Sequence, residues 1–270
     1  MKFLRKHPIW AGVLLIFLAL LLWTLWGNTA LMVTEYAIAD AEIPAAFDGF
    51  RIAQVSDLHN AEFGEKNERL LALLEETQPD MIAITGDMID SRRTDLEAAV
   101  TFAREAVKIA PTYYVPGNHE ARLPAEYTAL KTALSELGVV VLENESLLLT
   151  RQDAAITLAG LMDPDFGLPE PELTAEHYQV VLSHRPELLD KYAGEGLDLV
   201  FTGHAHGGQF RLPFIGGLFA PHQGFFPEYT SGVHTQGDTS MVISRGLGNS
   251  LFPLRFNNRP ELIVVTLESD

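Results

Sequence analysis

The 270-residue sequence predicts an α/β protein in which helices pack outside β-sheets. Between residues 51 and 142, short apolar, β-branched segments alternate with longer amphipathic segments, as buried strands alternate with connecting helices. The last third is richer in strand-like segments, Gly and Pro, which favours a second sheet with long loops. No stretch between residues 51 and 270 has the composition of a flexible linker, so we expect one domain over residues 31–270.

Residues 1–30 predict a membrane anchor. An uncharged run of eighteen residues, Ile9 to Trp26, is near the lower limit for a membrane-spanning helix, and all three tryptophans lie at its ends. No small-x-small cleavage site follows, which favours an uncleaved anchor over a signal peptide. Lys2, Arg5 and Lys6 precede the run and acidic residues follow it. By the positive-inside rule, the remaining chain lies outside the cytoplasm, on the cell membrane.

The elements after the anchor follow from the periodicity of apolar residues. Residues 31–50 are expected to form a lead-in strand and its connection. Nine strands are expected after it: Arg51–Ser56, Met81–Thr85, Thr112–Pro116, Val139–Leu142, Ile156–Leu161, Val180–Ser183, Leu199–Thr202, Met241–Ser244 and Leu262–Leu267. Apolar residues at helical spacing predict three helices: Glu65–Thr77, Leu96–Lys108 and Ala125–Leu137.

The charge balance excludes some partners. The chain has 19 Lys and Arg against 36 Asp and Glu. Because three basic residues and no acidic ones precede residue 30, the rest of the chain has 16 basic and 36 acidic residues, a net charge of −20. Such a charge repels a phosphate backbone, so nucleic acid is excluded as the main partner. The chain has no cysteine, which excludes thiolate metal sites, disulfides and cysteine nucleophiles.

Polar residues follow five of the expected strands directly. The segments are Asp57-Leu58-His59, Gly86-Asp87-Met88-Ile89-Asp90, Gly117-Asn118-His119-Glu120, Ser183-His184 and Gly203-His204-Ala205-His206. Asp57 and Asp87 are 30 residues apart, and Asp87 and Asn118 are 31 apart, which is about one β-α-β unit each. Successive units bring strand ends to one edge of a sheet, so these side chains are expected to meet there.

Carboxylate, imidazole and amide groups are suitable ligands for manganese, iron or zinc. Two such ions stabilise the attacking and leaving oxygens of a phosphoryl displacement and lower the pKa of a bound water to about 7. Each His or Asp taken alone is more often a capping, turn or core residue. The set is different, because five of the nine histidines fall in these strand-end segments. The sequence therefore predicts a site for two divalent metal ions.

The ordered set Asp-x-His, Gly-Asp-x-x-Asp, Gly-Asn-His-Glu, a lone His and Gly-His-x-His resembles the calcineurin-like metallophosphoesterase superfamily from about residue 50 to the C-terminus. The anchor, Gly203–Leu212 and Arg245–Arg259 resemble its bacterial membrane-associated YkuE/YaeI-type group most closely. The resemblance implies a four-layer α/β/β/α sandwich. It also implies hydrolysis of phosphoesters by a hydroxide that bridges two metal ions, with manganese favoured.

The resemblance also implies a role for each matching position. Asp57, His59 and His206 would bind the first metal, Asn118, His184 and His204 the second, and Asp87 would bridge them. His119 would face the substrate and stabilise or protonate the leaving oxygen. Asp90 would hydrogen-bond the other ring nitrogen of His119 and fix its tautomer.

Other residues have weaker functional signals. Gly207 and Gly208 could let the backbone approach the site or form a simple turn, with Gln209 after them. Arg245 is expected in a surface ion pair more than at a phosphate, and His222 at the surface more than in the site. The apolar loop Phe214–Phe226 is expected to pack into the core, with contact to lipid as the alternative.

The expected substrate is a phosphodiester or a lipid-linked phosphate of the cell envelope, because of the anchor, the apolar loop and the resemblance. Two alternatives stay open. One is a phosphomonoesterase, and the other is a metal-binding membrane scaffold without catalysis. The intact His119 and Asp90 disfavour the scaffold, since it requires no general acid.

Overall fold

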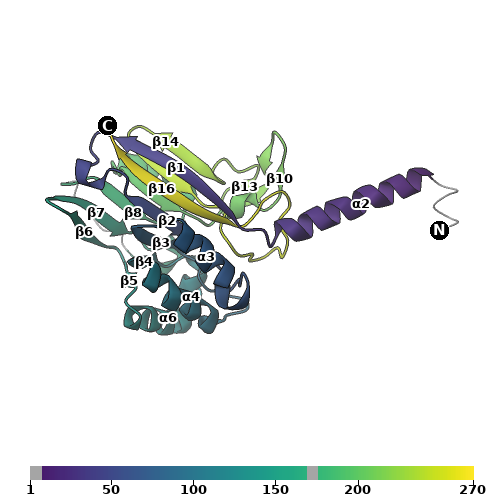
Figure 1. Cartoon of the computed structure of the whole chain (residues 1–270), viewed down its shortest axis with the longest axis horizontal. Helices are drawn as coiled ribbons and strands as arrows, with labels where there is room; N and C mark the ends of the chain where they lie inside the picture. The colour runs from purple at the N-terminus through teal and green to yellow at the C-terminus, as the bar shows by residue number, and fades with distance from the viewer. Residues whose placement is uncertain (1–7, 169–175) are drawn as a thin grey trace.

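The computed structural model describes residues 8–168 and 176–270, and two six-stranded sheets form its centre (Figure 1). The first sheet has the order β1 (Met32–Asp40), β16 (Glu261–Ser269), β2 (Arg51–Val55), β3 (Met81–Thr85), β4 (Thr112–Val115) and β5 (Val140–Val141). The second has the order β14 (Gly232–Gln236), β15 (Thr239–Ile243), β9 (Leu199–Thr202), β8 (Gln179–Leu182), β7 (Ala154–Gly160) and β6 (Glu145–Arg151).

The strands that precede the expected site residues run parallel within each sheet. In the first sheet β2, β3, β4 and β5 pair in parallel, while β16 is antiparallel to β2 and parallel to β1. In the second, β7, β8, β9 and β15 pair in parallel, and the edge strands β6 and β14 are antiparallel to their neighbours. The carboxyl ends of the parallel strands therefore share one edge in each sheet.

Apolar side chains fill three layers. Between the sheets, residues such as Ile52 and Ile263 share a buried cluster with Val180 and Phe201. Helices α3 (Glu68–Glu76), α4 (Leu96–Ile109) and α6 (Pro124–Glu136) bury apolar residues in a cluster with side chains of the first sheet. Helix α7 (Leu189–Gly194) does the same on the second sheet. This arrangement confirms the four-layer α/β/β/α sandwich.

The expected strands and helices all form, with ends that differ by a few residues. The strands β6 and β14 were not expected, because they lie at sheet edges and contain polar as well as apolar residues. Other elements too short for a periodic pattern are the helices α5 (Asn118–Ala121) and α7 and the strands β10 (Arg211–Leu212), β11 (Gly216–Gly217), β12 (Phe219–Ala220) and β13 (Gly224–Phe225).

Helix α2 (Pro8–Gly27) projects away from the sheets (Figure 1). Residues Ile9–Gly27 have a mean hydropathy of 2.4, are not buried against the body, and are long and apolar enough to cross a membrane. The basic residues Lys2, Arg5 and Lys6 lie outside the described residues. The division into an anchor at 1–30 and a domain at 31–270 stays a prediction.

Candidate metal centre

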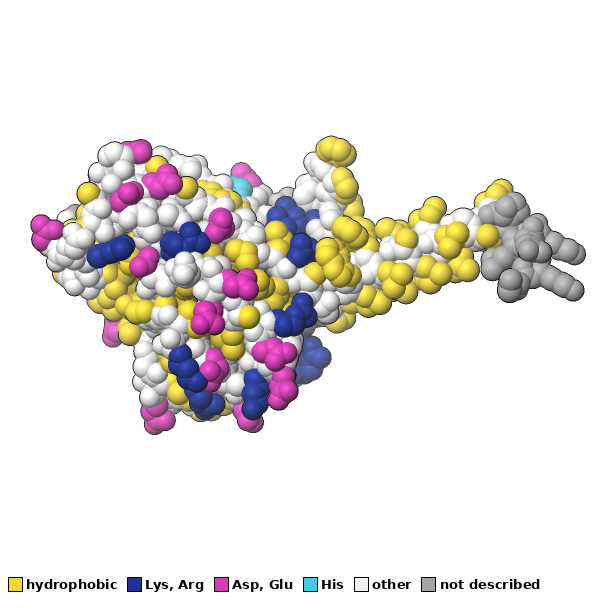
Figure 2. Space-filling model, in the orientation of Figure 1, with side chains coloured by type: hydrophobic (Ala, Val, Ile, Leu, Met, Phe, Trp, Pro, Cys, Tyr) yellow, Lys and Arg dark blue, Asp and Glu magenta, His cyan; other side chains and the backbone are white. Residues whose placement is uncertain are grey.

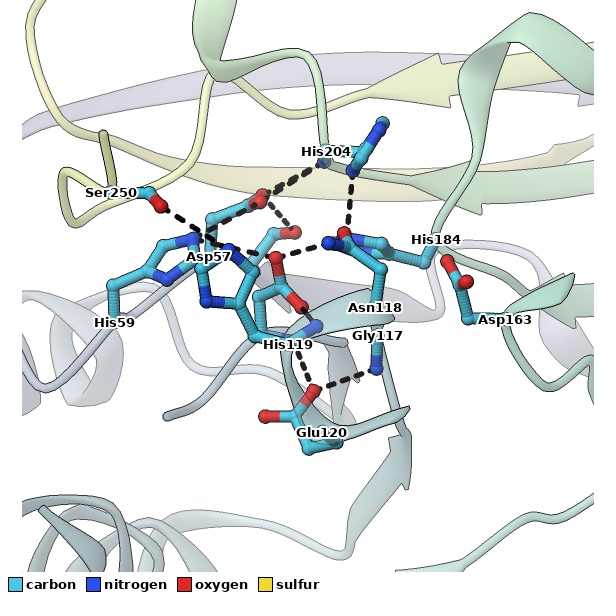
Figure 3. A network of polar contacts seen from close by, with 12 residues as sticks. Asp57, His59, Gly117, Asn118, His119, Glu120, Asp163, His184, His204 and Ser250 are labelled. Atoms are coloured by element: carbon cyan, nitrogen blue, oxygen red, sulfur yellow. Dashed lines mark hydrogen bonds and ion pairs between the residues drawn. The ribbon is translucent and has the colours of Figure 1, made fainter. Parts of the chain in front are cut away.

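The nine residues expected at the site come together where the two sheets present the carboxyl ends of their strands. Asp57 and His59 follow β2, Asp87 and Asp90 follow β3, and Asn118 and His119 follow β4. His184 follows β8, and His204 and His206 follow β9. All nine are buried. Figure 3 shows His184 and His204 of the second sheet beside Asp57, His59, Asn118 and His119 of the first.

The backbone at this edge is turned sharply. Asp57, His59, Asp87, His204 and His206 all have positive φ angles, between 46° and 65°. Non-glycine residues in this region are uncommon and concentrate at functional sites, where surrounding contacts hold them. Two motif glycines allow the loops to meet. A Cβ on Gly117 would lie 2.3 Å from Asp87 Oδ1, and one on Gly203 would lie 1.9 Å from Ser56 Oγ.

One cluster of donor atoms contains Asp57, His59 and His206. Asp57 Oδ1 lies 3.5 Å from His206 Nε2 and 3.9 Å from His59 Nε2. The other oxygen of Asp57 accepts a hydrogen bond from Ser56 Oγ over 2.6 Å, and both oxygens accept from the His204 N–H at 3.1 Å. These bonds fix the carboxylate so that Oδ1 faces the two imidazoles.

A second cluster contains His184, His204 and Asn118. His184 Nε2 lies 3.2 Å from His204 Nδ1 and 3.2 Å from Asn118 Oδ1 (Figure 3). Thr85 O lies 2.8 Å from His184 Nδ1 and can only accept, so Nδ1 carries a proton and Nε2 faces the cluster. With Oδ1 of Asn118 toward the imidazoles, this oxygen and the two ring nitrogens are three potential metal ligands that face one another. In the opposite orientation its amide group donates to His204 Nδ1 at 2.9 Å, and its oxygen accepts from Arg122.

Asp87 joins the two clusters. Its Oδ2 lies 3.4 Å from His59 Nε2 in the first and 3.2 Å from His184 Nε2 in the second. Its Oδ1 accepts a hydrogen bond from the His119 backbone N–H over 2.8 Å. One oxygen is therefore held by the protein, while the other is placed between two groups of nitrogen and oxygen ligands.

The residues present fit a pair of divalent cations. Burial lowers the pKa values of His59, His204 and His206, which leaves these imidazoles neutral at pH 7, the form that coordinates a metal. Both ring nitrogens of the buried His59 lack a hydrogen-bond partner among the residues that the structure describes. A bound cation would satisfy Nε2, which faces the carboxylates of Asp57 and Asp87.

Glu120, to which the sequence assigned no role, holds the loops of this centre together through hydrogen bonds. Its fully buried carboxylate accepts hydrogen bonds from the backbone N–H groups of Asp87 at 2.9 Å, Ile89 at 3.1 Å and Gly117 at 2.8 Å. Burial and the nearby Asp87 raise the pKa of Glu120 to about 8, against the effect of these bonds. Glu120 therefore ties the loop after β3 to the loop after β4.

The expected hydrogen bond between Asp90 and His119 is wrong. Asp90 Oδ1 accepts from the N–H of Arg92 at 2.8 Å and caps the turn, which directs Oδ2 toward His59 Nδ1, 3.6 Å away. The N–H of Ser91 instead donates to His119 Nδ1 over 2.9 Å. This bond leaves the proton of a neutral His119 on Nε2, which lies 3.2 Å from Ser250 Oγ.

His222, expected at the surface, contacts the site from its loop although its side chain is half exposed. Its Nδ1 lies 2.7 Å from Arg185 Nη1 and 2.8 Å from His204 Nε2. Because arginine can only donate, His222 Nδ1 is unprotonated and accepts. His204 therefore donates from Nε2, and its unprotonated Nδ1 faces the second cluster. Asp163 holds Arg185 through both carboxylate oxygens. The only sequence signal for this chain of contacts was the position of Arg185 directly after His184.

A cavity of about 260 Å³ opens onto the centre. Its polar wall contains Asp87, Asn118, His119, His204 and His206 with the basic residues Arg92 and Arg122, and its apolar wall contains Phe219, Pro221, Leu251 and Phe252. A larger hollow of about 1150 Å³ lies where β8 and β9 begin, and Asp40, Asp190, Asp198 and Asp238 are among the residues that line it. That acidic hollow would repel a phosphate and contains none of the nine expected residues.

The structure agrees with some of the weaker sequence predictions and contradicts others. Arg245 forms the expected ion pair, with Glu261 at 3.7 Å, but the Glu261 carboxylate is buried, so the pair does not lie at the surface. A Cβ on Gly207 would lie 2.2 Å from Asn258 Oδ1, and one on Gly208 would lie 2.4 Å from Gly217 Cα, so both glycines serve close approach between loops. The expectation of core packing is wrong for much of the loop Phe214–Phe226, since four of its large apolar side chains are exposed.

Residues 50–208 match the calcineurin-like phosphoesterase family. The chain is 34% identical to the uncharacterized metallophosphoesterase YkuE of Bacillus subtilis, over 87% of this chain and 85% of that protein. It is 31% identical to the phosphodiesterase YaeI of Escherichia coli, over 81% and 82%. The structure of sulfate thiohydrolase SoxB from Thermus thermophilus shares the fold, with a TM-score of 0.50 and 15% identity over 82% of this chain and 57% of that chain. The chain thus belongs to the calcineurin-like phosphoesterase family and is a metal-dependent phosphoester hydrolase.

Proposed function

We propose that the protein hydrolyses a phosphodiester or a lipid-linked phosphate of the cell envelope at a centre of two divalent ions, with manganese favoured. One observation carries the proposal: Asp87 Oδ2 lies between His59 Nε2 and His184 Nε2, at 3.4 and 3.2 Å. Asp57, His59 and His206 would hold one ion, Asn118, His184 and His204 the other, and Asp87 both. When bound, the two ions would supply a bridging hydroxide at neutral pH and neutralise charge on the phosphoryl group.

We assign His119 to the stabilisation of the leaving oxygen. The Ser91 N–H occupies its Nδ1, and Nε2 carries the proton at the edge of the cavity, 3.2 Å from Ser250 Oγ. A neutral imidazole held this way can donate a hydrogen bond from Nε2 to the leaving oxygen and stabilise the negative charge that develops there as the ester bond breaks. Arg92 and Arg122 line the same cavity and can bind the non-bridging oxygens of the phosphate.

The cavity favours a diester over a monoester. Leu251, Phe252 and Phe219 form an apolar wall on the cavity that His119 lines. This wall suits the second ester group of a diester or the chain of a lipid, whereas a monoester has only oxygens to place there.

The preference is tested with bis(p-nitrophenyl) phosphate and p-nitrophenyl phosphate as substrates for the manganese-loaded full chain. We expect the diester to have the higher kcat/KM and a chelator to abolish both activities. A markedly faster monoester would overturn the preference for diesters. If a broad panel of phosphoesters gave no turnover with metal bound, the scaffold alternative would replace the enzyme.

The helix α2 is assigned as an uncleaved membrane anchor, with residues 31–270 outside the cytoplasm. Its Ile9–Gly27 segment has the hydropathy and length of a membrane span, and basic residues precede it in the sequence. Protease treatment of intact spheroplasts should digest the catalytic domain. Protection of that domain would reverse the proposed orientation.

A further inference from the structure

The base of α2 is bound to a loop of the body. Asn28, which follows α2, donates from Nδ2 to Arg255 O over 2.8 Å and accepts at Oδ1 from the Arg255 N–H over 2.7 Å. The Arg259 guanidinium lies 5.1 Å from the centre of the Trp26 ring and donates to Ala30 O. A 20-residue helix is about 30 Å long, which matches the hydrocarbon core of a bilayer. A membrane-spanning α2 therefore holds Asn28 and Arg255 at the interface.

Two loops near this base, residues 214–226 and residues 251–254, expose large apolar side chains. In the first, Phe214 is fully exposed and Phe225 is 76% exposed; in the second, Leu251 is 60% exposed. Ile215, Phe226, Phe252 and Leu254 are also exposed. Gln209, five residues before Phe214, holds the second loop, because its Nε2 donates to Phe252 O and Leu254 O at 3.1 and 2.7 Å. Figure 2 shows hydrophobic side chains on the projections of the body beside the helix.

Basic side chains surround the same base, although the part of the chain beyond residue 30 carries a net charge of −20. Arg69 donates to Thr29 O at 3.2 Å, and Arg245 and Arg259 line a cavity of about 220 Å³ together with Trp23 and Trp26. Figure 2 shows Lys or Arg side chains on the body at the foot of the projection, near the base of the helix. Apolar side chains beside arginines, next to tryptophans, match the layers of a membrane interface with anionic headgroups.

The second loop is shared with the metal centre. Ser250, Leu251 and Phe252 line the cavity that holds His119 and His206, and Leu251 and Phe252 are also among the exposed apolar residues. An apolar loop held at the interface would consequently place the mouth of the cavity at the level of lipid headgroups.

We propose that the two loops, residues 214–226 and 251–254, insert into the interfacial layer of the bilayer that holds α2, so that the metal cavity opens at the lipid surface. This inference rests on the proposed anchoring of α2. The bilayer is assigned as the occupant because Asn28 and Arg255 fix the second loop to the end of the helix, and β13 of the first loop lies near the same end (Figure 1).

The test uses the absence of cysteine, which lets one introduced thiol carry a fluorophore. Phe214→Cys and Phe225→Cys report on the first loop, and Asp153→Cys is the control. Asp153 is exposed in the turn between β6 and β7, at the opposite edge from the centre. Each labelled full chain is placed in nanodiscs of phosphatidylcholine and phosphatidylglycerol that carry a doxyl-labelled lipid. The thermal unfolding midpoint of each variant, compared with that of the unsubstituted chain, confirms that the variant is folded.

We expect several-fold stronger quenching at positions 214 and 225 than at 153. Equal quenching at the three positions would overturn the proposal. Quenching between labels of two copies, without quenching by lipid, would also overturn it and assign the loops to a dimer interface. Quenching does not require turnover, so the docking of the loops can fail while the hydrolase function stands, and the reverse.

A second measurement tests what docking does to activity. Phe225→Glu combined with Phe226→Glu should lower hydrolysis of a bilayer-resident chromogenic phosphodiester about tenfold, because the charges oppose insertion. Hydrolysis of the soluble diester should be unchanged. Leu148→Glu, a matched change at an exposed leucine of β6, should affect neither. Unchanged bilayer activity in the double variant would contradict the placement of the cavity at the lipid surface.

Discussion

The backbone N–H of Ser91 donates a hydrogen bond to His119 Nδ1 over 2.9 Å. The bond requires an unprotonated Nδ1, so a neutral His119 carries its proton on Nε2, toward the cavity. The tautomer that can donate a hydrogen bond to a leaving oxygen is thus set by the backbone of the loop after β3, and no carboxylate is needed for it.

Replacing His119 should slow the reaction without removing metal. We expect His119→Ala to lower kcat about 10²–10³-fold for an ester with an alkyl leaving group, because the developing alkoxide loses the hydrogen bond that stabilises its charge. The loss should be much smaller for a p-nitrophenyl ester, whose leaving group delocalises its negative charge and needs less stabilisation. Rates with both substrates and the metal content of the variant check this. Equal losses with the two leaving groups would contradict a hydrogen bond from His119 to the leaving oxygen.

Asp90 should act through His59. Its Oδ2 lies 3.6 Å from His59 Nδ1, so Asp90→Ala removes the carboxylate that faces the outer nitrogen of a proposed metal ligand. Loss of such a partner costs about 10–100-fold in metal affinity. We expect activity to return when manganese is added in excess. A fall in kcat that excess metal fails to restore would indicate that Asp90 serves His119 after all.

His222 should control the second metal through His204. The contact of 2.8 Å from His204 Nε2 to His222 Nδ1 keeps the His204 proton on Nε2 and leaves Nδ1 free for a ligand bond. His222→Ala should therefore weaken binding of one of the two ions about 10–100-fold. His234→Ala is the matched control, since His234 packs against Tyr229. Isothermal titration with manganese that gave the same two affinities for both variants would disprove this role.

Metal binding should depend on pH. Burial lowers the pKa of His184, but the Asp87 carboxylate outweighs this and raises it to about 10 in the metal-free protein. At pH 7 His184 is therefore protonated, and an ion that binds Nε2 must displace a proton. Metal affinity should rise with pH through the neutral range, by up to about tenfold per pH unit for one released proton. Affinities at pH 6, 7 and 8 that do not change would rule out this competition.

The parts of the site that were predictable depend on single strands. Asp57, Asp87, Asn118, His184 and His204 directly follow strands whose apolar runs are readable from sequence, and parallel pairing brings strand ends together. The position of a residue after a parallel strand fixes the edge of the sheet at which it lies, so the gathering of the proposed ligands could be predicted without knowledge of side-chain contacts.

The parts that were not predictable depend on contacts between loops. Asp90 was paired with the wrong histidine because the turn that directs Oδ2 toward His59 is set by hydrogen bonds to Arg92 and Arg93. His222 lies 18 residues after His204 on a loop with no periodic pattern, so their contact can be found only from the three-dimensional structure. The segment that contains the exposed Phe214 and Phe225 has the apolar composition of a core segment. Hydrophobicity alone does not distinguish burial in protein from contact with lipid.

The position of Asp87 between two ions is tested most directly by anomalous diffraction from a crystal of the full chain grown with manganese. Two peaks are predicted about 3.5–4 Å apart, on either side of Asp87 Oδ2. One should lie beside Asp57, His59 and His206, and the other beside Asn118, His184 and His204. A single peak, or peaks that do not share Asp87, would contradict the account.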